Sequence, residues 1–202
     1  MYYAAQPYID GLTRLRSNYV STGRLATYYM GGSAPNVTWH QHIFRSRFYD
    51  KGGANPSSGN PSPPHLGTVG MTDLATGQVV ASVVVGPTPE HVVLSADGRY
   101  IAVVVANGTA SVRSDPKFDK VFGLLKVFAV GNGTLTPVAQ ADTGHWGQGA
   151  TFSRDNKLIL LQCAAEREIE VFKFNGKSLE QDKSATIAMG ARPGSIATAF
   201  SR

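Results

Sequence analysis

Six residues able to recognise a ligand stand in three short Gly- or Pro-containing segments, and each segment leads into a run typical of a β-strand. They are Glu90, His91, His145, Trp146, Gln148 and Arg192. Around one opening, Arg192 would pair with a negative charge and Trp146 would offer a ring for stacking. Such a set suits a sugar, a lactone or an anion. Ordinary packing of loop residues is the competing interpretation.

Two further histidines suggest weak candidates for a metal site. His40 and His42 fall on one face of an expected strand, about 7 Å apart along it, and with His65, His91 or His145 they could bind zinc or copper. No cysteine cluster or nearby carboxylate completes such a site in the sequence. Half-buried polar strand residues are therefore the simpler interpretation, and no metal or cofactor is expected.

The remaining reactive side chains have structural explanations. Glu166, Arg167, Glu168 and Glu170 alternate in the sign of their charge, and Glu168 and Glu170 point to the same side of an expected strand. This favours a solvated edge over a catalytic pair of carboxylates. The single cysteine, Cys163, is expected to be a small buried residue rather than a reactive thiol. The sequence has no phosphate-binding glycine loop, and no Ser-His-Asp set can be chosen from it. A nucleotide-dependent or triad enzyme is not expected.

A repeated hairpin supplies the elements that position these residues. In Pro89–Asn107, two apolar β-branched runs flank the pair Asp97-Gly98, which is the strongest short-range signal for a β-hairpin. The same pattern returns 58 residues later in Gly149–Ala164, with Asp155-Asn156 at the turn. The chain therefore contains an internal repeat, and its many glycines and prolines favour an all-β fold of short strands.

The repeat unit reads as four strands and a glycine lead-in. Its second copy, residues 144–189, spans 46 residues, close to the ~40–50 of a four-stranded propeller blade. The sequence predicts an all-β protein, a β-propeller of four-stranded antiparallel blades, in one domain covering residues 1–202. The approximate blades are 33–85, 86–143 and 144–189, and 1–32 and 190–202 would contribute strands of incomplete or shared blades. Between blades, Phe152 and Leu160 are expected to be buried.

Two stretches carry a family resemblance. TDLATGQVVASVVVGPTPEHVVLSADGRYIAVVVAN resembles the unit of YVTN-repeat propellers, in which an aspartate-led strand and a Thr-Gly turn precede a Gly-Pro lead-in and a Ser-x-Asp-Gly turn. LKVFAVGNGTLTPVAQADTGHWGQGATFSRDNKLILLQCAAEREIEVFKFNGKSLE is more similar to the lactonase-like branch. The resemblance covers about Gly67 to Arg202 and implies a seven-bladed β-propeller. Trp146 and Gln148 stand where that family usually has a proline and a small residue.

About three to four blades are present, and three whole blades do not close a ring. One alternative is that Ser195–Phe200 pairs with the N-terminal strands to give a fourth blade, the smallest number usually found. The favoured alternative is a piece of a seven-bladed protein, which would expose apolar faces and strand edges. Self-association through these open blade edges is then expected.

Charge and composition limit the classes of partner that we expect for this chain. The formal net charge is +5, and residues 1–60 hold six Lys or Arg against two Asp. Without a basic run or a recognisable nucleic-acid module, nucleic-acid binding is not expected. No segment reaches the ~20 consecutive apolar residues of a membrane span, and the first residues do not resemble a signal peptide. The sequence therefore does not indicate a cellular location. A periplasmic or secreted location would be compatible with it if the sequence is truncated at its N-terminus.

These observations predict a non-catalytic propeller scaffold that binds a small molecule or a protein through its loop face. The alternative is a lactonase-like hydrolase acting on a sugar lactone, in which a lead-in His or Glu would position water. Convergence of Glu90, His91, His145 and Arg192 around one pocket would favour the enzyme. Scattering of these residues would favour the binding scaffold.

Overall fold

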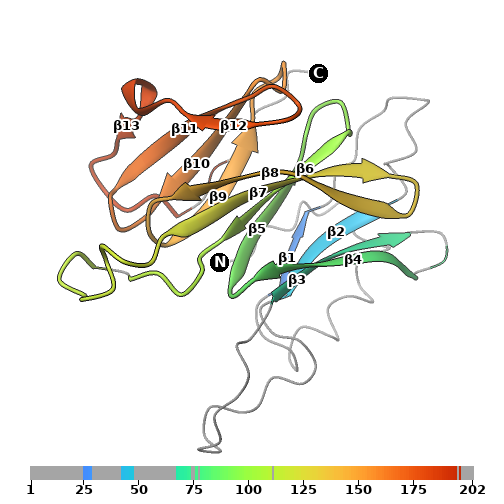
Figure 1. Ribbon diagram of the computed structural model, residues 1–202, viewed down its shortest axis with the longest axis horizontal. Coiled ribbons are helices and arrows are strands. Elements are labelled where there is room, and N and C mark those ends of the chain that lie inside the picture. The colour runs from blue at the N-terminus through green and yellow to red at the C-terminus, as the bar shows by residue number, and fades with distance from the viewer. Residues whose placement is uncertain are drawn as a thin grey trace, which may run out of the picture.

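The computed structural model describes residues 25–28, 42–47, 67–73, 76, 78–110, 112–194 and 196. Over these ranges the chain is almost entirely β-strand, as the repeat predicts, and its only helical element is the short 3₁₀ turn Lys183–Ala185. The strands form three antiparallel sheets, each following the order of the chain. Figure 1 shows the three sheets side by side, and they form an open arc over the described ranges.

Each sheet is a meander of neighbouring strands. The first sheet contains β1 (Leu25–Tyr28), β2 (His42–Arg47), β3 (Gly67–Asp73) and β4 (Val79–Gly86). The second contains β5 (Pro89–Leu94), β6 (Tyr100–Val105), β7 (Gly123–Gly131) and β8 (Thr134–Thr143). The third contains β9 (Gly147–Phe152), β10 (Leu158–Cys163), β11 (Glu168–Phe174) and β12 (Leu179–Gln181), and β13 (Ile187–Ala188) also pairs with β11.

The repeated hairpin is held by the same hydrogen bonds in both copies. The Ser95 hydroxyl donates to Asp97 at 2.7 Å and accepts from the backbone N–H of Tyr100 at 3.0 Å. Ser153 makes the equivalent bonds in the third sheet, at 2.6 and 2.9 Å. The turn needs a residue with positive φ, which Gly98 supplies at +73° and Asn156 at +59°. The Ser-x-Asp pattern is therefore a structural signature of this turn.

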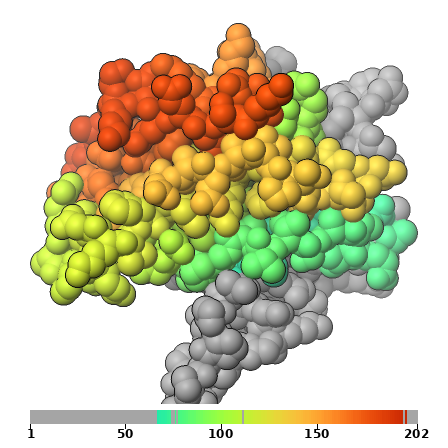
Figure 2. Space-filling view, in the orientation of Figure 1, coloured from blue at the N-terminus to red at the C-terminus, as the bar shows by residue number. Residues whose placement is uncertain are grey.

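Two apolar clusters lie between the sheets. In β6, Ile101 and Val103 point toward the first sheet, and Ala102 and Val104 point toward the third. Successive side chains of a strand point to opposite faces, so a strand without polar residues must be covered on both sides. The second sheet is therefore the middle layer. Figure 2 shows the green first sheet, the yellow strands of the second and the red third sheet as successive layers.

Of the two side chains expected between blades, one is buried and the other is not. Phe152 is 3% exposed within the cluster that joins the second and third sheets, as predicted. The prediction for Leu160 is wrong, because its neighbours Ile159 and Leu161 face that cluster and Leu160 points to the opposite face of β10, where it is half-buried. Successive side chains of β10 point to opposite faces, and the sequence prediction assigned Leu160 to the wrong one of the two.

Some sequence predictions fall outside the described residues. These include the strands expected in 1–24 and most of the expected strand Ser195–Phe200, of which only Ile196 is described. Ile196 lies close to Gly149 of β9, since a Cβ at Gly149 would sit 3.3 Å from its side chain. Among the described residues, no helix is both long enough and apolar enough to cross a membrane.

Truncating Phe152 to Ala should lower the free energy of unfolding by about 3–5 kcal/mol, because it opens a cavity between two sheets. Truncating Leu160 to Ala removes a half-buried side chain, and the loss should stay below about 2 kcal/mol. Denaturant unfolding of both variants measures the difference. Equal losses for the two variants would show that the faces of β9 and β10 are assigned incorrectly.

Candidate functional site

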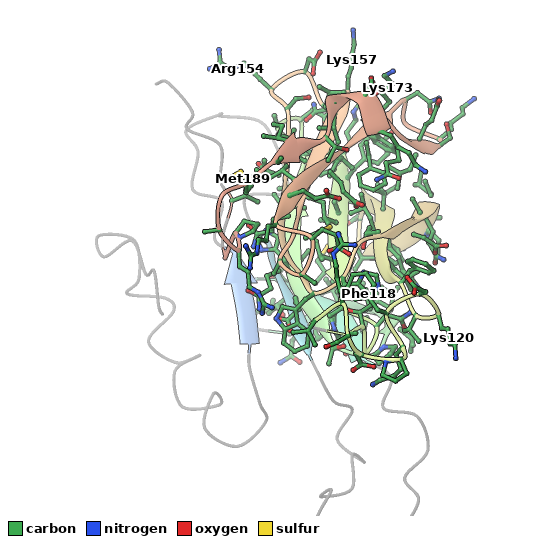
Figure 3. The ribbon with its side chains drawn as sticks, turned by 90° about the vertical axis from the view of Figure 1, so that its left-hand side faces the viewer. Phe118, Lys120, Arg154, Lys157, Lys173 and Met189 are labelled. Atoms are coloured by element: carbon green, nitrogen blue, oxygen red, sulfur yellow. The ribbon has the colours of Figure 1, made fainter. Side chains whose placement is uncertain are left out.

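The six predicted ligand residues are distributed around one end of the sheets. In a meander, alternate connections lie at the same end, so the β4–β5, β6–β7, β8–β9 and β10–β11 connections meet there. Met189 also lies at this end, because its N–H donates to the carbonyl oxygen of Arg167 in the β10–β11 connection at 2.7 Å. We call this end the loop face. It is on the left in Figure 1, and Figure 3 looks onto it, with Phe118 and Met189 labelled.

His145 is a buried link between two connections of the loop face. It is 2% exposed, its Nδ1 contacts the carboxylate of Glu166, and its Nε2 contacts the carbonyl oxygen of Phe118. Its ring also stacks on the ring of Phe118, with centroids 3.8 Å apart and planes 13° apart. The backbone N–H of His145 donates to Glu166 at 2.9 Å. The imidazole therefore fastens the long β6–β7 connection to the third sheet.

The acidic residues beside this link are not the solvated edge that the sequence predicted. Glu170 is 5% exposed, because it shares the face of β11 with Phe172 and Phe174, which pack on the second sheet. Its carboxylate accepts from the N–H of Gly144 at 3.1 and 3.2 Å and from Gln181 at 2.9 Å. Burial raises the pKa of Glu170. The carboxylate closes the lead-in turn rather than facing solvent.

Cys163 is fully buried beside this carboxylate, as the sequence predicted. Burial, followed by the nearby charge of Glu170, raises the pKa of its thiol. A thiol of this kind stays protonated and is neither a nucleophile nor a metal ligand. Among the described residues, no group of three or more His, Cys, Asp or Glu side chains could hold a metal ion. The imidazoles of His40, His42 and His65 lie outside that description.

His91 is enclosed between the inner strands of two sheets. It lies on β5, is 3% exposed and is hydrogen-bonded to the backbone of Ala150 on β9. Burial lowers its pKa to about 4, against the opposing effect of the bond to Ala150. At neutral pH the ring is therefore uncharged, and it serves to hold β5 against β9.

Trp146 is the exposed member of the set. Its side chain is 38% exposed, while its backbone has a φ of +56°, which is unusual for a residue other than glycine. The backbone N–H of Trp146 donates to the Thr109 hydroxyl at 3.0 Å. That hydroxyl donates in turn to the carbonyl oxygen of Ala106 at 2.7 Å. The surrounding structure thus fixes an unfavourable backbone and presents the indole outward, a combination that clusters at binding sites.

Two more apolar side chains are exposed in the β6–β7 connection, at the same end of the sheets as Trp146. Phe122 is 44% exposed and its ring lies 5.5 Å from that of His145, and Val112 is also 44% exposed. The amide of Asn107 donates to the carbonyl oxygen of Phe122 at 2.9 Å and fixes its backbone. We call Val112, Phe122 and Trp146 the loop-face patch.

The six predicted residues therefore separate into three kinds. His91 and His145 are buried in contacts between sheets, and Glu90 and Gln148 are half-buried on the inner strands β5 and β9. Trp146 and Arg192 are exposed. Sequence reasoning missed Phe118 and assigned Glu166 to a solvated edge, although both are partners of His145. The available signals were an aromatic residue inside a polar insertion and an acid three residues after the end of β10.

Replacing His145 by Ala should loosen the β6–β7 connection, because the imidazole contacts the carbonyl oxygen of Phe118 through Nε2, contacts Glu166 through Nδ1 and stacks on the Phe118 ring. We expect a loss of about 1–3 kcal/mol in unfolding free energy and faster amide exchange at Phe118, Lys120 and Val121. Hydrogen exchange with mass spectrometry measures this. The control is Arg167→Gln, an exposed change in the neighbouring connection. Unchanged exchange in the histidine variant would contradict the proposed link.

The buried imidazole of His91 should make the folded protein less stable in acid. The ordinary pKa of a histidine is 6.5, and the pKa of His91 in the folded chain is about 4, so at pH values between these two the unfolded state binds the proton more strongly. The contribution is complete above pH 6.5 and falls by about 3 kcal/mol as the pH drops to 4. Denaturant unfolding of the wild type and His91→Gln across this range isolates the effect. The same pH dependence in both proteins would exclude His91 as its source.

No protein-family model matches the sequence, and no curated protein is significantly similar to it. Solved structures are similar in fold. A proposed 6-phosphogluconolactonase from Bacteroides fragilis has a TM-score of 0.56 at 19% identity, over 77% of this chain and 38% of that chain. Hydrazine synthase from Kuenenia stuttgartiensis has a TM-score of 0.53 at 13% identity, over 78% of this chain and 49% of that one.

A third similar structure is the β-propeller domain of Cps50 from Myceliophteria thermophila, with a TM-score of 0.50 at 11% identity, over 77% of this chain and 42% of that domain. The chain spans less than half the length of these three structures. Likeness at such identities concerns the fold alone. Together with the three meander sheets, it shows that the chain has the β-propeller fold and that its sheets are four-stranded antiparallel blades.

Proposed function

We propose that this chain is a non-catalytic binding scaffold that takes a protein partner on its loop face. The observation that carries the proposal is the loop-face patch, Val112, Phe122 and Trp146, whose side chains are exposed while hydrogen bonds fix the backbones of Phe122 and Trp146. Exposed apolar groups gathered at one place mark interaction surfaces, and Trp is among the residues that contribute most to binding energy. A backbone that is already fixed loses little entropy when a partner binds.

The charges near the patch favour a partner with acidic residues. Exposed cations stand in the same connections and in the segment after β13: Arg113, Lys117, Lys120, Arg167 and Arg192. In these segments the five cations stand against three acidic residues, Asp115, Asp119 and Glu166, and Glu166 is bound to His145. A peptide that combines apolar anchors with Asp or Glu would match the patch and the charges around it.

A lactonase-like hydrolase acting on a sugar lactone is the alternative function. A sugar-lactone activity is proposed for the B. fragilis protein of similar fold, and such an enzyme would need a lead-in His or Glu able to reach a substrate. Here both lead-in imidazoles are buried and hydrogen-bonded to protein groups. This favours the binding scaffold over the hydrolase.

A peptide selection followed by affinity measurement tests the proposal. Peptides selected on the wild-type chain from a displayed random library should combine acidic and apolar residues, and Trp146→Ala should weaken them by about tenfold or more. The matched control is Val84→Ala, which also removes an exposed apolar side chain but lies on β4. Equal weakening by both changes would contradict the proposed surface.

The same protein should show no hydrolysis of glucono-δ-lactone above the buffer rate. A rate that the wild type shows and Glu90→Gln loses would replace the binding proposal by the hydrolase. Both preparations need the same unfolding midpoint for this comparison, which excludes damage to the fold as the cause of a lost rate.

A further inference from the structure

The third blade has an apolar face on the side directed away from the second blade. In β10, Ile159 and Leu161 pack toward the second blade, so Leu160 and Gln162 lie on the opposite face. Two rows of cross-strand neighbours cross this face: Thr151, Leu160 and Val171 in one row, and Gly149, Gln162, Ile169 and Ile187 in the other. We call this surface the outer face of the third blade.

The internal repeat indicates what covers a face of this kind. Ala102 and Val104 of β6 precede Leu160 and Gln162 by the repeat shift of 58 residues. Their cross-strand neighbours form the same two rows in the second blade: Val93, Ala102 and Val127, and His91, Val104 and Leu125. These rows pack against the third blade, which buries Ala102 and Val104 completely. The corresponding rows of the third blade therefore form a face that suits a further blade.

In this structure the outer face of the third blade is only partly covered. Ile187 is 46% exposed, and Leu160 and Ile169 are half-buried. Near β9 the face is covered by Ile196, because a Cβ at Gly149 would lie 3.3 Å from the side chain of Ile196. The single chain thus leaves apolar surface in water along β10, β11 and β13, which costs stability unless another surface covers it.

The amide of Gln162 is unpaired within this outer face. Gln162 is fully buried, yet neither its Oε1 nor its Nε2 has a hydrogen-bond partner in the part of the chain that the structure describes. Buried amides are nearly always hydrogen-bonded, because an unpaired one lowers the stability of the fold. Val104, the corresponding residue of the second blade, needs no such partner. Gln in place of Val therefore favours a covering surface that has hydroxyl groups among its apolar side chains.

The first blade, on the other side of the second blade in Figure 2, carries a surface of this kind. In β4, Val83 packs toward the second blade, so Ser82 and Val84 lie on the opposite face. Val80 lies on that face too, and both valines are exposed, Val84 to 59%. Ser82 and Thr68, the cross-strand neighbour of Val84, add hydroxyl groups. This outer face of the first blade thus combines apolar side chains with hydroxyl groups.

We propose that the outer face of the third blade binds the outer face of the first blade in a second copy of this chain. Within the chain, the second blade covers the first and the third covers the second, each with the face directed toward the blade before it. The first blade has the same face free, and the third blade has the opposite face free. A second copy would therefore continue the packing that already joins the blades, through a head-to-tail contact between two different surfaces.

A second copy is the occupant that accounts for both outer faces at once. It covers the half-buried rows of the third blade and the exposed valines of the first blade in a single contact. Neither outer face includes a residue of the loop-face patch. The association is therefore independent of the peptide binding proposed above and goes beyond it.

Two variants of the full chain, each blocked on one outer face, test this contact by sedimentation velocity. Leu160→Gln with Ile187→Lys blocks the third blade, and Val80→Gln with Val84→Lys blocks the first blade, because burying an unpaired charge is unfavourable. The wild type should associate as its concentration rises, and each variant alone should stay monomeric. An equimolar mixture of the two variants should form a dimer and nothing larger, since each variant keeps one open face and these two faces are complementary. The control Thr136→Lys adds a charge at an exposed position of β8 and should associate like the wild type.

Three other results would overturn the proposal. Dimers formed by the variant blocked on the first blade alone would show that two third blades pair with each other. A wild type that stays monomeric would show that the chain covers both faces with its own residues. Loss of association in the Thr136→Lys control would show a general effect of charge. Unfolding midpoints verify the fold of each variant, and the single changes Ile187→Lys and Val84→Lys, both at exposed side chains, repeat the test if a double variant is destabilised.

Discussion

Strand β6 packs apolar side chains against both neighbouring blades, Ile101 and Val103 on one side and Ala102 and Val104 on the other. A sheet that is apolar on both faces is not stable by itself in water. Each face contributes to stability only when another blade buries it. Stacking of the blades is the result. Exposed residues then lie at the two ends of the meanders, the loop face and the turns opposite to it, and on outer strands such as β4 and β8.

The loop face depends on that packing in a direct way. The lead-in between the second and third blades is closed by Glu170, which lies on the packed face of β11, and the long β6–β7 connection is fastened by His145. These buried contacts occupy the imidazole of His145 and the carboxylates of Glu166 and Glu170. The backbone of Trp146 is fixed separately, because its N–H donates to the Thr109 hydroxyl.

The repeated hairpin made the fold predictable, because its signal is local: the Ser95 and Ser153 hydroxyls bond within their own turns. The roles of the candidate ligand residues are harder to predict from the sequence, because they depend on partners far away in the chain. The sequence indicates a ligand group at His145, whereas in the fold Phe118, 27 residues away, covers its ring. The alternating charges predict a solvated Glu170, whereas its face of β11 packs on another blade.

The central claim is that a partner binds to the fixed, exposed patch of the loop face. Cross-saturation NMR measures this most directly, because irradiation of a bound peptide attenuates the amide signals of the residues that touch it. With a peptide selected on the chain, the account predicts attenuation at Val112, Phe122 and Trp146, and unchanged signals at the exposed valines of β4. Attenuation confined to β4, with the loop face unaffected, would contradict it.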